Sequence, residues 1–162
     1  MWYIPPVDTT IDDLIKTSPV PVNFTSEIGE SGVESAIRMG VFYFDPPRIE
    51  ILSSLSDWQK LTTLIHEISH AKCHKEKCGC DDVADKSGAE IHAYRYTLEW
   101  LLKNKRRKTL RSEMKHLVKQ SDREDYYGKV AKHIMKLELW QKCLKYVGKL
   151  IITESEVMKC SE

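Results

Sequence analysis

The chain has 162 residues, of which 41% are hydrophobic and 30% are charged. These values are typical of a folded globular protein with room for one ordinary domain, and they exclude wholesale disorder. The net charge of +1 is unevenly spread, because residues 1–102 carry 9 Lys+Arg against 16 Asp+Glu, whereas residues 103–150 carry 15 against 5. A basic C-terminal third could bind nucleic acid or an acidic partner, or it could be the solvated face of amphipathic helices.

The sequence predicts no membrane segment and no export signal. Residues 1–16 lack a basic stretch followed by an apolar one, and no apolar run approaches the roughly 18 residues of a membrane span. We therefore expect a cytoplasmic protein. In that compartment cysteines are expected to be thiols or metal ligands rather than a disulfide framework. The chain has five of them: Cys73, Cys78, Cys80, Cys143 and Cys160.

The first 54 residues predict a short helix and strands. A helix is expected over residues 10–17, ended by Ser18-Pro19, and a short strand over residues 20–24. Residues 36–44 and 48–52 predict a hairpin around Asp45-Pro46-Pro47, because both segments are rich in strand-forming residues. In its second strand Ile49 and Ile51 should face the core.

The next segment predicts a helix that carries the main motif of the chain. Ser56 and Gln59 fit a capping box, and apolar residues recur at helical spacing over residues 61–68. Inside this helix, residues 66–70 read His-Glu-Ile-Ser-His, an H-E-x-x-H pattern. Residues four apart share one helix face, so His66 and His70 can reach one metal ion, and Glu67 is placed to take a proton from water.

A hydrolytic zinc site needs a third protein ligand, and Glu90 is the leading candidate. It lies on a helix expected over residues 87–105, at the spacing of the face that carries Ala93, Thr97 and Leu101. A carboxylate rarely occupies a core face without a partner, and a metal ion would be one. The alternative is a capping role for Glu90 in an S-x-x-E pattern with Ser87.

Other residues could take the place of Glu90. The rival ligands are His92, Cys73, His74, Cys78 and Cys80. The last four could instead form a second, structural zinc site or a redox-sensitive clasp near the catalytic one, although their spacing differs from paired C-x2-C knuckles. An oxyanion-stabilising side chain is also expected near a hydrolytic metal, and the sequence does not choose among several. These are Tyr94, Arg95, Tyr96, Tyr126, Tyr127 and His133.

The C-terminal third is expected to be helical. Residues 110–120 predict one amphipathic helix, and apolar residues spaced by three or four predict another from residue 122 to about 151. Residues 153–162 are expected to be a frayed tail.

Residues 35–103 resemble the ImmA/IrrE-type metallopeptidases. The resemblance consists of a strand with Ile49-Glu50-Ile51, the segment LTTLIHEISHA (61–71), and EIHAY (90–94) leading into an apolar stretch ending in Leu101-Leu102. It implies that His66, His70 and Glu90 bind zinc and that Glu67 is the general base. It also implies a protein substrate in the same cell, such as a repressor. Ser69 stands where that family usually has Gly, and Lys103-Asn104 where it usually has Met-Pro.

Together these patterns predict one α+β, zincin-like domain with a short antiparallel sheet or hairpin and a mostly helical C-terminal half. The catalytic part is expected over residues 1–105, a basic helical extension over 106–152 and the tail over 153–162. The expected function is Zn²⁺-dependent cleavage of an intracellular protein, with an edge strand of the hairpin receiving the extended substrate. One alternative is a nucleic-acid- or protein-binding regulator that uses residues 103–150 on a zincin scaffold. Another is a catalytically idle zincin that acts as an inhibitor or toxin partner.

Overall fold

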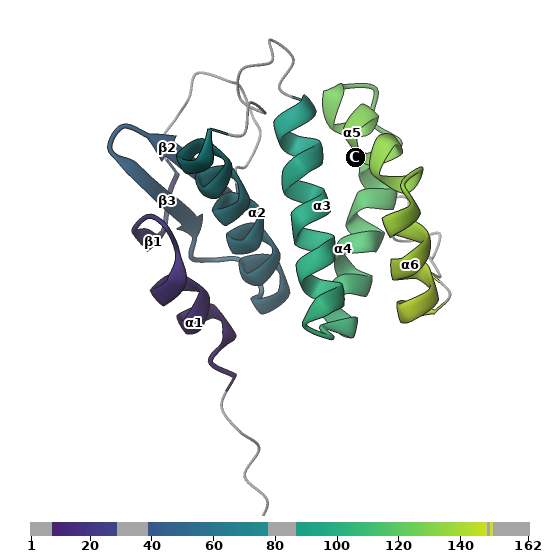
Figure 1. The fold of residues 1–162 in the computed structure, drawn as a ribbon, viewed down its shortest axis with the longest axis horizontal. Helices are drawn as coiled ribbons and strands as arrows, with labels where there is room; N and C mark the ends of the chain where they lie inside the picture. Colours follow the sequence, from purple (N-terminus) through teal and green to yellow (C-terminus); the bar gives the residue numbers. More distant parts are fainter. Residues whose placement is uncertain (1–7, 29–38, 78–86, 149, 151–162) are drawn as a thin grey trace, which may run out of the picture. The chain divides into compact units, whose positions relative to one another are not determined.

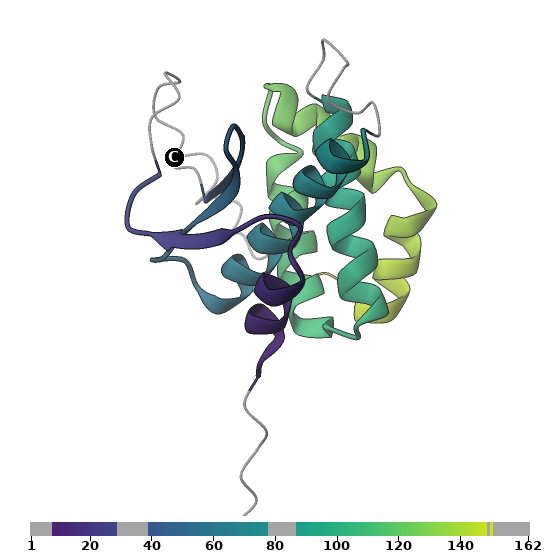
Figure 2. The ribbon, with the colours of Figure 1, turned by 60° about the vertical axis from the view of Figure 1, so that its left-hand side comes forward.

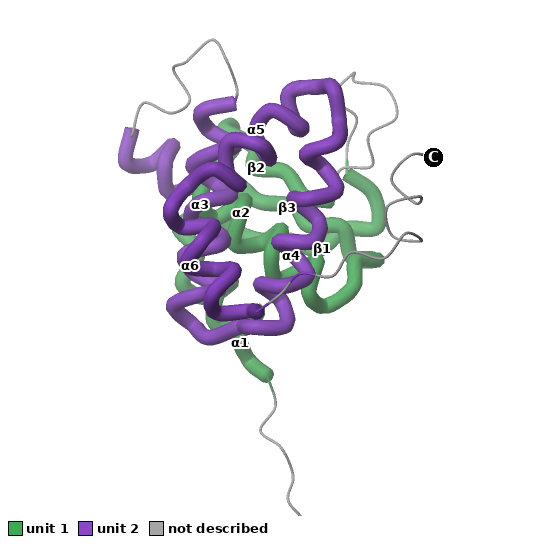
Figure 3. Tube along the Cα trace, turned by 90° about the vertical axis from the view of Figure 1, so that its right-hand side faces the viewer, with its two compact units in different colours: residues 1–71 green, residues 72–162 purple. Residues whose placement is uncertain are grey.

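A computed structural model describes residues 8–28, 39–77, 87–148 and 150 (Figure 1). These residues form a mixed α+β structure, as the sequence predicts, and they divide into two compact units, residues 1–71 and residues 72–162 (Figure 3). The boundary falls inside one helix, α2. None of the described helices is both long enough and apolar enough to cross a membrane.

The first unit contains a small sheet and two helices. Helix α1 spans Thr10–Thr17, which are the bounds expected from the sequence, and the strands are β1 (Val22–Thr25), β2 (Gly40–Phe44) and β3 (Pro47–Leu52). Helix α2 spans Asp57–Glu76. Figure 2 shows the two helices beside the strands. The expected hairpin is confirmed, since β2 and β3 pair antiparallel with Phe42 opposite Ile49.

Besides the expected antiparallel hairpin, the sheet has a third strand that makes it mixed. The strand order is β1-β3-β2, and β1 pairs with β3 in the parallel direction, with Val22 opposite Ile49. The hairpin already occupies one side of β3, so β1 adds to the other side. Sequence patterning predicts the strands but not the direction in which separated strands pair.

The core of the first unit lies between the sheet and its helices. Ile49 and Ile51 are fully buried, as expected, and they cluster with Phe42 from β2 and with Leu64 and Ile68 from α2. Helix α1 adds half-buried aliphatic side chains to the same cluster. Burial of this apolar stripe fixes the rotation of α2 against the strands.

The second unit consists of the end of α2 and four further helices. These are α3 (Ser87–Lys103), α4 (Arg107–Gln120), α5 (Tyr126–Met135) and α6 (Glu138–Val147). Helix α3 packs against each of the other three, and α4 packs against α5 and α6 (Figure 1). Their buried faces are mostly aliphatic, including Leu98, Leu101, Leu110, Leu117 and Ile134.

The single helix expected from residue 122 to about 151 is wrong. The chain breaks between α5 and α6 at Lys136 and Leu137, where Leu137 has an extended backbone. No Gly or Pro marks this break, and apolar residues continue across it at helical spacing, so the sequence conceals it. Gly148 does end α6, with a φ of 81°.

Some expectations fall outside the described residues. They are residues 36–38 of the first hairpin strand, Cys78, Cys80, and the tail 153–162.

Candidate metal centre

Helix α2 begins as its sequence predicts. The backbone N–H of Ser56 donates to Gln59 Oε1 at 3.2 Å, and the Ser56 hydroxyl donates to the same oxygen at 2.9 Å. Asp57, the first helical residue, lies at the positive end of the helix dipole. These contacts fix where the helix starts, and therefore which side chains share each of its faces.

The two histidines of the motif lie together on α2. His66 Nε2 and His70 Nε2 are 3.2 Å apart, and both residues are half-buried. A tetrahedral zinc ion bound at about 2.0–2.1 Å from each nitrogen would hold the two nitrogens roughly 3.3 Å apart. The pair therefore fits two positions of one coordination sphere. The same separation also suits an N–H···N bond between two neutral imidazoles.

Glu67 is buried beside the first residue of β2. The side chain is 9% exposed. An ideal Cβ at Gly40 would lie 3.3 Å from Glu67 Cγ and only 2.5 Å from Thr63 Cγ2, so a side chain at residue 40 would displace its neighbours. Only glycine lets the strand approach α2 this closely. The sequence does not reveal the requirement for glycine at residue 40, because this requirement comes from a contact between separate elements.

Helix α2 buries an unusual number of polar side chains. Thr62, Thr63 and Ser69 are each less than 9% exposed, in addition to Glu67. The Ser69 hydroxyl has no hydrogen-bond partner among the described residues. Burial of polar groups costs free energy unless they are paired or have a function. Thr62 is paired, because its hydroxyl donates to the backbone oxygen of Gln59 at 3.2 Å, so the unexplained burial is that of the Ser69 hydroxyl.

Glu90 belongs to the second unit, where it is half-buried in the first turn of α3. Two of the residues expected to share its face, Ala93 and Thr97, are buried, whereas His92 is exposed. Among the rival ligands on α2, His74 is also exposed. Glu90 is therefore better shielded from solvent than His92, and burial favours Glu90 of these two candidate ligands.

The end of α2 is tied to α3 within the second unit. Lys72 Nζ donates to the Tyr96 hydroxyl at 2.9 Å. Lys72 is two residues after His70, and Tyr96 is six residues after Glu90. This contact, which the sequence does not reveal, joins the last part of α2 to α3.

The expectation of a reduced thiol is wrong for Cys73, which is disulfide-bonded and buried. A disulfide sulfur carries no thiolate to offer to a metal ion, so Cys73 is not a ligand in this state. The sequence predicts reduced thiols because the protein is expected to be cytoplasmic. It does not show which sulfur atoms lie close enough to form a disulfide. Cys143 is a free thiol, and burial, followed by the charge of Glu99, raises its pKa to about 11.

Of the candidates for oxyanion stabilisation, Tyr94 is the most buried. Burial, and then the charges of Glu113 and Glu90, raise the pKa of Tyr94 well above its ordinary value. Its hydroxyl keeps its proton at neutral pH and lies 3.4 Å from Gln120 Oε1. Three other candidates, Tyr96, Tyr126 and Tyr127, are half-buried. The remaining two, Arg95 and His133, are exposed.

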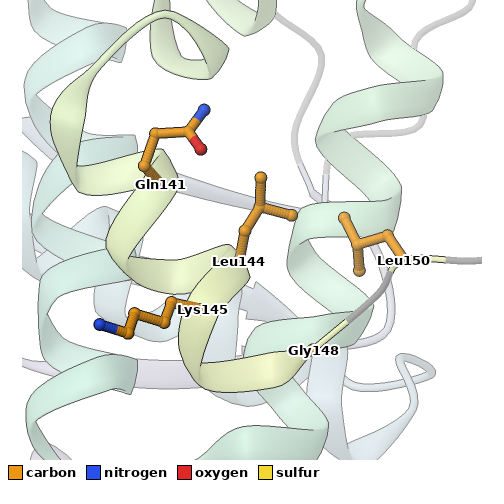
Figure 4. A pocket seen from close by; sticks show the side chains of 5 residues that line it. All are labelled: Gln141, Leu144, Lys145, Gly148 and Leu150. Atoms are coloured by element: carbon orange, nitrogen blue, oxygen red, sulfur yellow. The ribbon is translucent and has the colours of Figure 1, made fainter.

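A shallow pocket in the second unit lies at the C-terminal end of α6. It is lined by Gln141, Leu144, Lys145, Gly148 and Leu150 (Figure 4). No residue of the H-E-x-x-H motif belongs to it, and its lining offers no set of metal-ligating side chains.

No protein-family model matches the chain, and neither curated proteins nor solved structures include a match to it.

Proposed function

We propose that the protein is a zinc-dependent peptidase in which His66, His70 and Glu90 hold the ion and Glu67 is the general base. The observation that carries the proposal is the 3.2 Å separation of the two imidazole nitrogens on α2. It matches two positions of a tetrahedral zinc site. Glu67, the proposed general base, directly follows the first of these ligands in the sequence.

The third ligand is supported by chemistry and by burial. Two imidazoles and one carboxylate are a donor set that could hold a metal ion, and they are typical of hydrolytic zinc sites, which leave one position open. Glu90 is half-buried on α3, the helix that Lys72 at the end of α2 contacts through Tyr96. The resemblance to ImmA/IrrE-type enzymes assigns the same three residues. The proposal therefore includes a zincin-like arrangement of α2, α3 and the sheet.

In this mechanism the bound ion supplies Lewis-acid activation of a water molecule and of the scissile carbonyl. The Glu67 carboxylate takes a proton from the attacking water and passes it to the nitrogen of the leaving amine. Because Glu67 is only 9% exposed, little bulk water competes for its carboxylate. A side chain at residue 40 would press on Glu67, so glycine at this position leaves the carboxylate undisturbed.

The substrate is proposed to be an intracellular protein, for which the resemblance suggests a repressor or another regulator. A test that does not require its identity uses a library of protein-derived peptides with blocked amino termini. The zinc-loaded protein should generate new amino termini in this library, detected by mass spectrometry. Glu67→Gln should retain zinc and generate them about 10²- to 10⁴-fold more slowly, the usual contribution of a general base.

A matched control is Glu76→Gln, the same change at the exposed last residue of α2. This variant should cleave at the wild-type rate. The proposal is wrong if Glu67→Gln binds zinc fully and produces the same new termini within a few-fold of wild type.

A further inference from the structure

The second unit has a strongly basic end that the proposed peptidase activity does not use. Residues 103–112 contain six Lys and Arg and no Asp or Glu. They form the end of α3, the turn after it and the start of α4. The C-terminal ends of α3 and α6 and the N-terminal end of α4 lie at the same end of this unit (Figures 1 and 2).

Two arginines join α4 to α6 at this end. Arg107 Nη2 and Arg111 Nη2 both donate to the backbone oxygen of Val147, the last residue of α6, at 3.2 and 2.5 Å. They satisfy a carbonyl that the helix itself leaves without a partner. The same contacts bring Lys145 to this part of the unit, with its side chain directed away from Leu144 (Figure 4). We call the following group the basic end: Lys103, Lys105, Arg107, Lys108, Arg111 and Lys145.

The basic end is open to solvent, since five of its members are exposed and Arg111 is half-buried. No carboxylate among the described residues forms an ion pair with any of them. Lys103 and Lys145 lie in last turns, where the helix dipole favours cations. Arg107 and Lys108 lie in the first turn of α4, where the dipole disfavours them and no acidic residue is present. Helix ends therefore account for Lys103, Lys145 and the two arginines on Val147, but not for Lys105 and Lys108.

The connection between α4 and α5 has the opposite charge from the basic end. The connection from α4 to α5 lies at the opposite end, and it carries Asp122, Glu124 and Asp125 against a single cation, Arg123. Because the whole chain has a net charge of only +1, attraction of a polyanion would be a local property of the basic end.

The chemistry of the basic end fits a phosphate backbone better than a protein surface. Protein interfaces have an apolar centre, whereas contacts to nucleic-acid phosphates need only cations and hydrogen-bond donors. The large hydrophobic side chains that the described residues expose are Phe24 and Phe44, and both belong to the first unit. We propose that the basic end binds the phosphate backbone of nucleic acid without reading its sequence.

The test measures binding of a labelled random-sequence DNA duplex by fluorescence anisotropy, from about 50 to about 200 mM KCl. A triple variant, K103Q/K108Q/K145Q, removes three exposed cations and leaves the arginines on Val147 in place. We expect it to weaken binding at least about tenfold and to reduce the slope of log affinity against log salt by about 2 to 3, since each phosphate contact contributes about 0.9.

The control is K119Q/K129Q/K132Q, which removes the same charge from the end of α4 and from α5. It should bind within about two-fold of wild type, and circular dichroism should show both variants folded. Equal weakening by the two triple variants would overturn the proposal, because only total charge would then matter. Failure of the wild type to bind DNA at the lowest salt, or tighter binding of polyglutamate than of DNA, would also overturn it.

Discussion

Helices α2 and α4 differ in how deeply they bury their polar residues. Helix α2 buries Thr62, Thr63, Glu67 and Ser69, whereas the buried face of α4 is Leu110, Met114 and Leu117 with one carboxylate, Glu113. The lysines and arginines of α4 are exposed or half-buried. A polar group held away from water costs free energy unless it is paired. Most polar residues of α4 avoid this cost because they reach solvent, the exceptions being Glu113 and the buried Nε of Arg111.

This difference predicts two kinds of response to substitution. The chemistry proposed for α2 depends on a fixed arrangement of a few atoms, so one substitution should have a steep effect. The binding proposed for the start of α4 depends on the number of charges, so effects should be graded and sensitive to salt. Each variant below tests one side of this contrast.

The largest effect is expected for metal binding. His66→Ala removes a ligand, and loss of even an outer-shell partner costs 10- to 100-fold in metal affinity, so we expect a loss of more than about 100-fold. Glu90→Ala should behave in the same way, and His92→Ala, an exposed control two residues further on, should not. Zinc affinity is measured by competition with a chromophoric chelator.

Glu90 is the informative member of this series, since it belongs to the second unit. If Glu90→Ala binds zinc with wild-type affinity, Glu90 is not a ligand and the proposed three-ligand set is wrong. The zinc-binding residues would then be those of α2. A loss equal to that of His66→Ala would support Glu90 as the third ligand.

The next effect concerns stability and compares two glycines. Gly40→Ala places a methyl group 2.5 Å from Thr63 Cγ2, and overpacking of this kind costs about 1–3 kcal/mol of unfolding free energy. Gly88→Ala is the matched control, because it lies in the first turn of α3 and its new methyl group meets no atom within 4 Å. Helix propensity should make that change stabilising by up to about 1 kcal/mol.

Urea denaturation measures both changes. Gly40→Ala should also reduce cleavage under native conditions, since the new methyl group lies 3.3 Å from Glu67 Cγ. Unchanged stability and unchanged cleavage would show that β2 moves away from α2 at little cost, and that the strand does not position the carboxylate.

Sequence predicts those parts of this molecule that depend on local signals. The bounds of α1, the capping of α2 by Ser56 and Gln59, and the inward-facing Ile49 and Ile51 are all confirmed. Each follows from a few neighbouring residues whose hydrogen bonds or periodicity decide the outcome.

Features that depend on contacts between distant segments could not be predicted. The parallel pairing of β1 with β3, the break at Leu137 and the disulfide of Cys73 have no local signature. For the candidate site, helical spacing predicts the proximity of His66 and His70, but not the requirement for Gly40. The ligand role of Glu90 stays a prediction, because it depends on how two separate helices are placed.

The smallest effect concerns a polar residue of the second unit whose role is structural. The Asp125 side chain accepts a hydrogen bond from the backbone N–H of Gly128 and caps the start of α5. Asp125→Ala should therefore lower the unfolding free energy by about 1 kcal/mol. Asp122→Ala is the matched control, since it removes an exposed carboxylate just after α4 without removing that cap.

The pH dependence of this effect has a definite sign. A hydrogen bond from Arg123 lowers the pKa of Asp125 below its ordinary value in the folded protein. The stability that the ionised carboxylate contributes is thus complete above its unfolded pKa of about 3.9, and is lost as the pH falls through the lower folded value. The difference between wild type and Asp125→Ala, measured by urea denaturation, should be constant near neutral pH and shrink below about pH 4. A stability difference that grows on acidification would mean that Asp125 does not act as an ionised cap. The polar side chain of Asp125 in the second unit would then have a role other than stabilising the local helix.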